Sequence, residues 1–256
     1  GVQYQVEKLD WEEKKAFVCT CTPEQLDADM KETNADNSYS GRCTNVGAEE
    51  LQKLKDDKTP FVVRIKIPDT PVTTHDLLKG DIQTSPGQVD SFVILKADGT
   101  PTDTFASACD DMISGISLIV CSENDLSNAP KQEHIKRLLG YEQETQYVHL
   151  PVMLNKEGKK MNMHDDTSSV KWLFEQGFIP DAIANYLIVL GNQTPTEIFT
   201  MPEALEWFDL SKLSKSPVTF DIEKLRMINR KHLEMMDDKR LSGLFGFADE
   251  DIGKLA

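Results

Sequence analysis

The strongest constraint on the fold is a change of pattern near residue 165. Before it, short β-branched or apolar runs at residues 61–67, 92–95 and 117–121 alternate with amphipathic helical segments. Such alternation is typical of an α/β domain, and the fully apolar run 117–121 is typical of a short strand in a parallel sheet. After residue 167 the apolar spacing is helical almost throughout. The sequence therefore predicts an α/β part followed by an all-α part.

A local signal marks the start of one early helix. Thr22, Pro23 and Gln25 follow the pattern of a cap residue, a proline at the first helical position and a capping-box partner. Apolar spacing predicts further helices over residues 5–16, 48–57, 105–113, 128–139, 168–176, 181–190, 202–208, 222–237 and 240–255, and strand-like runs over residues 17–21 and 147–154.

Composition excludes some classes of protein. Among the 256 residues, 43 acidic side chains exceed 28 basic ones and give a formal charge of −15, which disfavours non-specific binding to DNA or other nucleic acids. No apolar stretch reaches the roughly 18 residues of a membrane span. Five unevenly spaced cysteines fit a reducing, cytoplasmic setting better than a disulfide framework.

Several motifs occur in a fixed order. Residues 75–82 read HDLLKGDI, residues 90–102 read DSFVILKADGTPT, and residues 123–131 read ENDLSNAPK. Residues 178–187 (FIPDAIANYL) and 213–217 (LSKSP) follow. Together they resemble the bacterial glutamyl-tRNA synthetase family of class I aminoacyl-tRNA synthetases, over nearly the whole chain.

The resemblance implies a partial Rossmann-type catalytic domain with an inserted small α+β acceptor-end domain, followed by an α-helical stem-contact region. We expect residues 1–21 to precede the insert, 22–88 to form it, 89–155 to form the second half of the catalytic domain, and 156–256 to carry the signature loop and the helices. No His-Ile-Gly-His-like motif occurs. We therefore expect a truncated, degenerate paralogue without the N-terminal ATP-binding half and the anticodon-binding domain.

The loop at residues 160–164 departs from the ATP-handling loop of the family, Lys-Met/Leu-Ser-Lys-Ser/Arg. Lys160 and Met161 fit, but Asn162, Met163 and His164 replace the last three positions. Met163 carries no charge and donates no hydrogen bond to phosphate, so the resemblance implies weakened ATP handling. Residues 212–216 match the pattern, yet they precede a proline within the all-α part, and we assign them to the stem-contact region.

The positions equivalent to the substrate pocket also depart from the family. Asp103 replaces a tyrosine, Ser107 an asparagine and Cys121 an arginine, while Glu123 and Ser127 complete the set. Loss of the arginine removes the fork that holds a carboxylate, and Asp103 would repel an anionic substrate.

Each of these positions also has a structural interpretation. Cys121 at a strand end is more often a small buried hydrophobic residue, and Ser127 with Asn128 suits a helix cap. Asp110 and Asp111 suit the end of a helix. Cys109, Cys121 and His149 show no spacing that supports a thiol site.

Cys19, Cys21 and Cys43 form a sparse cluster. The resemblance implies structural zinc at a Cys-x-Cys pair with a later cysteine, and Tyr39 is the best candidate for the fourth ligand because Asn45 offers only a neutral amide. The alternative is three free cysteines, and both interpretations stay open here.

Four functions follow. The first is a paralogue that does not activate glutamate and acts in binding or regulation. The second is an ATP-dependent tRNA-glutamylating ligase, split or trimmed. The third is an RNA acceptor-stem module that uses basic residues Arg64, Lys66, Lys79, Lys131, Lys136, Arg137, Lys212, Lys215, Arg226, Arg230 and Lys231. The fourth binds another protein or a second copy through Leu225, Met227, Met235 and Met236, although leucine and methionine at helical spacing are more often core.

Overall fold

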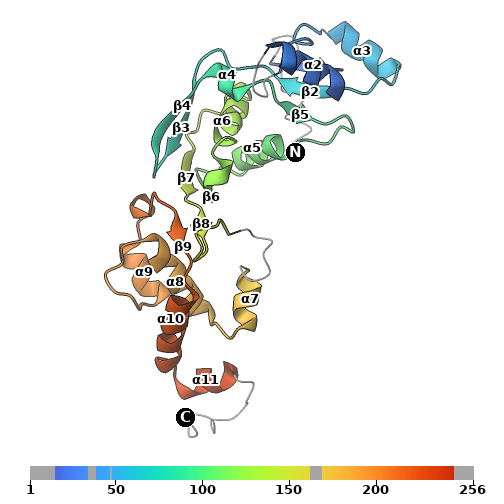
Figure 1. Ribbon diagram of the computed structural model, residues 1–256. Helices are drawn as coiled ribbons and strands as arrows, with labels where there is room; N and C mark the ends of the chain where they lie inside the picture. The colour runs from blue at the N-terminus through green and yellow to red at the C-terminus, as the bar shows by residue number, and fades with distance from the viewer. Residues whose placement is uncertain (1–14, 34–38, 47, 162–168, 245–256) are drawn as a thin grey trace. The chain divides into compact units, whose positions relative to one another are not determined.

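The computed structural model describes residues 15–33, 39–46, 48–161 and 169–244, and it divides into two compact units, Gly1–His149 and Leu150–Ala256. Nearly all of the helix predicted over residues 5–16 lies outside the described residues. The predicted mixed α/β architecture is confirmed: among the described residues, strands are concentrated in the first unit, whereas helices occur in both units (Figure 1). No helix among the described residues is both long enough and apolar enough to span a membrane.

A three-stranded antiparallel sheet opens the first unit. Its order is β1 (Ala16–Cys19), β2 (Val62–Ile65) and β5 (Val93–Leu95). Helices α2 (Pro23–Thr33) and α3 (Ala48–Asp56) lie between β1 and β2 in sequence. The predicted capping box is confirmed, because the Thr22 amide donates to Gln25 Oε1 (3.0 Å) and the Gln25 amide to Thr22 Oγ1 (3.3 Å).

A four-stranded sheet follows in the order β4 (Gly80–Thr84), β3 (Val72–Asp76), β7 (Gln146–Leu150) and β6 (Leu118–Ser122). Strands β3 and β4 form an antiparallel hairpin, whereas β3 and β7 run parallel. Gly80 begins β4 with φ +77°, a conformation that favours glycine over residues with a side chain.

Short helices complete this unit: α4 (Pro86–Val89), α5 (Asp103–Ile113), the 3-10 turn η1 (Glu123–Asp125) and α6 (Ala129–Leu138). Helices α5 and α6 pack against each other (Figure 1). A buried cluster joins the first sheet to these helices through Ile65, Ile94, Phe105 and Ile135. The three strands of the first sheet come from three of the four segments predicted from sequence: β1 from 1–21, β2 from 22–88 and β5 from 89–155. The boundaries of these segments stay a prediction.

The strand predicted at residues 117–121 forms, but it is less buried than the strands of parallel sheets usually are. Strand β6 lies at the end of the sheet order, and Leu118 and Val120 are 36 % and 49 % exposed. Apolar runs predict a strand covered on both faces. Among the described residues, no element covers the side chains of Leu118 and Val120 well enough to bury them.

The second unit contains β8 (Met153–Leu154), α7 (Val170–Glu175), α8 (Pro180–Gly191), α9 (Met201–Trp207), the 3-10 turn η2 (Leu210–Lys212), β9 (Val218–Thr219), α10 (Ile222–Glu234) and α11 (Asp238–Leu244). Strands β8 and β9 pair in parallel, and helices α8 and α10 pack together. Ile179, Ala182, Tyr186, Leu225 and Ile228 are central to the core.

One buried amide ties the second unit together. Asn185 is 0 % exposed; its Nδ2 donates to the Glu197 carbonyl (2.9 Å), and its Oδ1 accepts from the Phe199 amide (3.1 Å) and lies 2.8 Å from His232 Nε2. Because Oδ1 is an acceptor, His232 Nε2 carries the proton in this contact.

The four residues predicted to bind another protein, on helix α10 and directly after it, differ in their exposure. Leu225 is fully buried and Met236 packs against the core, whereas Met227 and Met235 are 43 % and 61 % exposed.

Candidate functional site

One pocket of the first unit gathers mainly polar side chains from five elements. The first turns of α5 contribute Asp103, Thr104 and Ser107, β6 contributes Ile119 and Cys121, η1 and the start of α6 contribute Asp125, Asn128, Ala129 and Gln132, and β7 contributes Tyr147 and His149. The cavity volume is about 240 Å³. Its lining includes two aspartates and neither lysine nor arginine.

A buried aspartate orients the histidine of this pocket. His149 Nδ1 lies 2.6 Å from Asp76 Oδ2, and both side chains are 0 % exposed. The backbone amides of Leu78 and Lys79 donate to Asp76 Oδ1, each at 2.8 Å. Burial alone would raise the pKa of Asp76, but hydrogen bonds from His149, Lys79 and Leu78 outweigh that effect and lower it. Asp76 is therefore a carboxylate, and His149 Nδ1 donates to it.

The structure brings together three of the five residues predicted for the substrate pocket. Asp103, Ser107 and Cys121 line the cavity, whereas Glu123 and Ser127 are not among the lining residues. Glu123 instead pairs with Lys79, with 2.8 Å between the charged atoms. The functional roles of all five stay predictions.

Sequence reasoning missed most of the lining. Alternation along β7 places Tyr147 and His149 on one face of the strand, where their rings stack with centroids 5.8 Å apart. The alternation of side chains along this strand could have been recognised in the sequence. The hydrogen-bond partner of His149, which is Asp76 and lies 73 positions away, could not. Cys109, considered with Cys121 and His149 from sequence, is buried in the core.

Helix α6 begins as its sequence suggests, but without the expected side-chain bond. Asn128 occupies the cap position and makes no capping hydrogen bond through its side chain. The predicted cap position is therefore confirmed at Asn128, although its side chain does not supply the capping hydrogen bond. Asp110 and Asp111 lie in the last turn of α5, as predicted.

The predicted signature loop is described only at its start. Lys160 forms a bridge with Leu154, and the Met161 amide donates to the Met153 carbonyl (2.9 Å). Gly158, with φ +76°, turns this hairpin. Asn162, Met163 and His164 lie outside the described residues. The alternative match to the signature pattern, residues 212–216, begins at the last residue of η2. Its Lys212 pairs with Asp209, with 3.4 Å between the charged atoms.

Many basic residues predicted for phosphate contact are engaged elsewhere. Lys136 is 2 % exposed and lies 3.2 Å from Glu133. Other such pairs are Lys66 with Asp69, Arg226 with Glu223, and both Arg230 and Lys231 with Glu234. On the helix at residues 222–234, exposed acidic and basic side chains are therefore interspersed and pair with one another.

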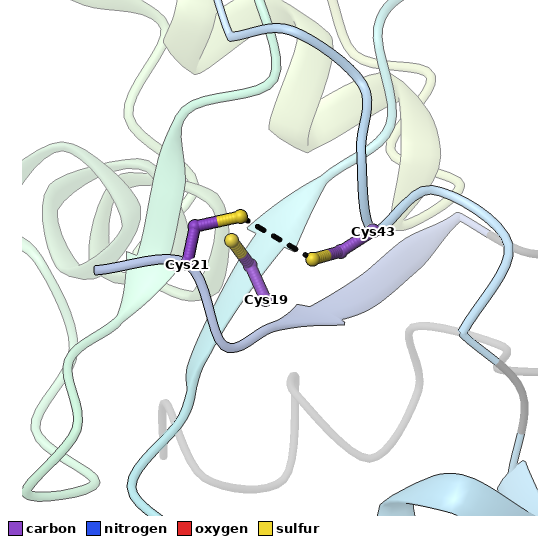
Figure 2. A group of neighbouring side chains, drawn as sticks. All are labelled: Cys19, Cys21 and Cys43. Atoms are coloured by element: carbon purple, nitrogen blue, oxygen red, sulfur yellow. Dashed lines mark hydrogen bonds between the residues drawn. The ribbon is translucent and has the colours of Figure 1, made fainter. Parts of the chain in front are cut away.

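A second cluster lies at one face of β1, where Cys19, Cys21 and Cys43 converge (Figure 2). Their sulfur atoms all lie within 4.8 Å of one another, and those of Cys21 and Cys43 are 3.5 Å apart. Tyr39 Oη lies 3.9 Å from Cys21 Sγ and accepts a hydrogen bond from the Cys43 amide (2.8 Å). The four predicted metal-binding side chains are therefore neighbours.

The donor set fits a tetrahedral divalent ion. Zinc bound to thiolates at about 2.3 Å sets sulfur atoms about 3.8 Å apart, close to the Cys21–Cys43 separation. Burial raises the pKa of Cys21 to about 12, with Cys43 and Cys19 adding to the rise. The Cys21 thiol therefore resists ionisation beside its two neighbours, and a bound cation would favour its thiolate form.

Arg64 supplies a positive charge beside this cluster. Its guanidinium carbon lies 4.3 Å from the centre of the Tyr39 ring, and Nη1 donates to the Ser91 carbonyl (2.8 Å). Burial would raise the pKa of Cys19, but hydrogen bonds involving Tyr39, the Cys21 backbone and Arg64 outweigh it and lower the pKa. Arg64 thus favours thiolate at the cluster and is not available as a phosphate contact.

Comparison with known proteins decides the family. The family model of class I tRNA synthetases (E and Q), catalytic domain, matches residues 4–227. The chain belongs to this family. A relative named glutamate–tRNA ligase 2, from a Sulfurovum species, is 63 % identical over 245 residues, covering 96 % of this chain and 56 % of the relative. Glutamate–tRNA ligase 1 from a Nitratiruptor species is 51 % identical over 247 residues, with 95 % and 56 % covered.

Solved structures of synthetases agree with the fold. A glutamate-tRNA synthetase from Elizabethkingia anophelis matches with a TM-score of 0.80 and 25 % identity, over 99 % of this chain and 59 % of that one. A glutamate tRNA ligase from Elizabethkingia meningosepticum, in complex with its amino acid, matches with a TM-score of 0.78 and 26 % identity, over 94 % and 56 %. The chain spans little more than half the length of these synthetases and of the curated relatives.

Proposed function

We propose that this chain is a glutamyl-tRNA synthetase-like protein that does not activate glutamate and acts in binding or regulation. The charge of the pocket carries the proposal. Asp103 and Asp125 line it, and Cys121 stands where the resemblance places an arginine. Glutamate brings two carboxylates and one ammonium group, and carboxylates facing carboxylates are disfavoured in a partly enclosed site.

ATP–pyrophosphate exchange with glutamate tests this function. The natural full-length protein should give no exchange above a no-enzyme control, with the Nitratiruptor ligase as the positive control. Exchange that disappears in Lys160→Ala, a residue of the predicted signature loop, would overturn the proposal.

The second candidate is an active ATP-dependent tRNA-glutamylating ligase. Its support is the 63 % identity to a protein named glutamate–tRNA ligase 2. The same exchange assay separates the two candidates, because a ligase of this kind must form an activated glutamate before transfer. Glutamylation of tRNA by the natural full-length protein would establish this second function directly.

A binding role on the acceptor stem of tRNA follows from the same family membership. The ion pairs of Lys66, Arg226 and Arg230 leave fewer cations for phosphate than the sequence suggests. We therefore expect weak binding with a shallow dependence on salt. Titration of labelled tRNA at two salt concentrations measures this slope, and a steep slope would mean that these ion pairs open to phosphate.

We also propose that Cys19, Cys21, Cys43 and Tyr39 hold one structural zinc ion. Three thiols and a phenol within one small cluster support it. Metal analysis of untagged protein should find about one equivalent of zinc, and Cys43→Ser should lose it. Cys121→Ser, outside the cluster, is the matched control. Less than about a tenth of an equivalent, with unchanged melting after chelation, would refute the zinc site.

A further inference from the structure

The pocket contains a buried histidine nitrogen that the fold leaves without a hydrogen bond. His149 is 1 % exposed and lines the cavity. Among the described residues, no partner lies within hydrogen-bonding distance of its Nε2, and that atom is buried. Buried polar atoms are normally satisfied, so an orphaned one beside a cavity indicates a ligand.

Asp76 determines what this nitrogen can do. Because the Asp76 carboxylate accepts from His149 Nδ1 at 2.6 Å, the neutral imidazole carries its proton on Nδ1. The lone pair is therefore on Nε2, which is an acceptor. A ligand that satisfies it must bring an N–H or O–H group.

The charges around the cavity narrow the ligand further. Asp103 and Asp125 line it without a lysine or arginine among the lining residues, and the nearby Lys79 is already paired with Glu123. The thiol of Cys121 lies in the same negative surroundings: burial, followed by the charges of Asp125 and Asp76, raises its pKa to about 11. The pocket is thus rich in acceptors and negative in charge.

We propose that this pocket binds a small cationic amine, which donates a hydrogen bond to His149 Nε2 and pairs with the carboxylates of Asp103 and Asp125. The inference rests on the proposed loss of glutamate activation and names the ligand class that replaces glutamate. An ammonium group supplies both the donors and the charge that the lining lacks.

Ornithine and glutamate are a matched pair of probes. The ornithine ammonium nitrogen lies as many bonds from Cα as the side-chain carboxylate oxygens of glutamate do, so the two differ mainly in the sign of that charge. Calorimetric titration of the natural full-length protein should detect ornithine at millimolar concentrations or below and should detect no glutamate. The ¹⁵N resonance of His149 Nε2 should shift when ornithine is added.

Two aspartates on α5 provide the variant and its control. Asp103→Asn should weaken ornithine binding up to about fivefold, as for a partly exposed ion pair. Asp110→Asn, on the same helix but outside the lining, should leave the affinity unchanged.

Three results would overturn the inference: glutamate binding as tight as ornithine, no binding of either, or equal effects of the two substitutions. If neither ornithine nor glutamate binds and no ATP–pyrophosphate exchange occurs, the amine site is refuted and the proposed function is not. Glutamate binding accompanied by exchange would refute the proposed function as well.

Discussion

Asp76→Asn probes the buried pair on which the pocket depends. The carboxylate accepts four hydrogen bonds: the amides of Leu78 and Lys79 on Oδ1, and the amide and Nδ1 of His149 on Oδ2. Asparagine retains one acceptor oxygen and turns an NH₂ group toward donors. Two buried donors then lose their acceptor, whichever way the amide is turned.

The expected loss of stability is large. Removing one partner of a buried ionic or strongly hydrogen-bonded pair costs about 3–5 kcal/mol, and two unsatisfied buried donors at about 1–3 kcal/mol each give a similar range. The same hairpin offers a matched control, because Asp81 lies 2.8 Å from His75 with side chains 67 % and 39 % exposed. Asp81→Asn should cost about 0–1 kcal/mol.

Urea unfolding followed by far-ultraviolet circular dichroism, with hydrogen exchange at the β7 amides, measures both variants. A loss below about 1 kcal/mol for Asp76→Asn, or a loss equal to that of Asp81→Asn, would refute the assigned pairing. The pH dependence gives a second check. Since the folded-state pKa of Asp76 is lowered, its contribution is complete above the unfolded-state pKa and is lost as pH falls through the folded-state value. The difference between wild type and Asp76→Asn should therefore shrink below about pH 4.

Three further predictions concern other contacts. Arg64→Met should weaken zinc affinity about 10–100-fold in a chelator competition, whereas Arg42→Met, whose exposed guanidinium pairs with Asp29, should not. Asn185→Ala should cost at least about 2 kcal/mol in urea unfolding because three groups lose their partner, and the part-buried Asn192→Ala under about 1 kcal/mol. Thr200→Ala removes the capping box of α9 and should cost about 1 kcal/mol by the same measurement, with no change in zinc content.

Local signals carried much of the fold. The Thr22–Gln25 capping box and the strand at residues 62–65 follow from short spacings, and both occur as predicted. The two-residue strand Val218–Thr219 was missed because so short a segment has no periodicity to detect. Strand β6 is more exposed than its apolar sequence suggests, because apolar character indicates which environment a strand prefers and not which elements of the chain cover it.

The site was only partly predictable because it joins distant residues. The cysteine cluster spans 24 positions and could be recognised from Cys19, Cys21 and Cys43 together. The contact between Asp76 and His149 spans 73 positions and needs the parallel register of β3 and β7. No spacing rule relates two such residues before the sheet order is known, so the orphaned Nε2 could not be anticipated.

Stability and chemistry place different demands on this scaffold. Asp76 and Asn185 are buried and fully engaged in hydrogen bonds, so their loss would cost several kcal/mol, a large fraction of the stability of a typical domain. Asp103 and Ser107 lie on exposed turns of α5, where substitution changes stability by only about 0.5 kcal/mol. Selection for folding alone therefore preserves the first pair of residues and leaves the second pair free to change. Family membership fixes the scaffold and not the chemistry of its site, so measured exchange, and not the 63 % identity, decides whether this chain activates glutamate.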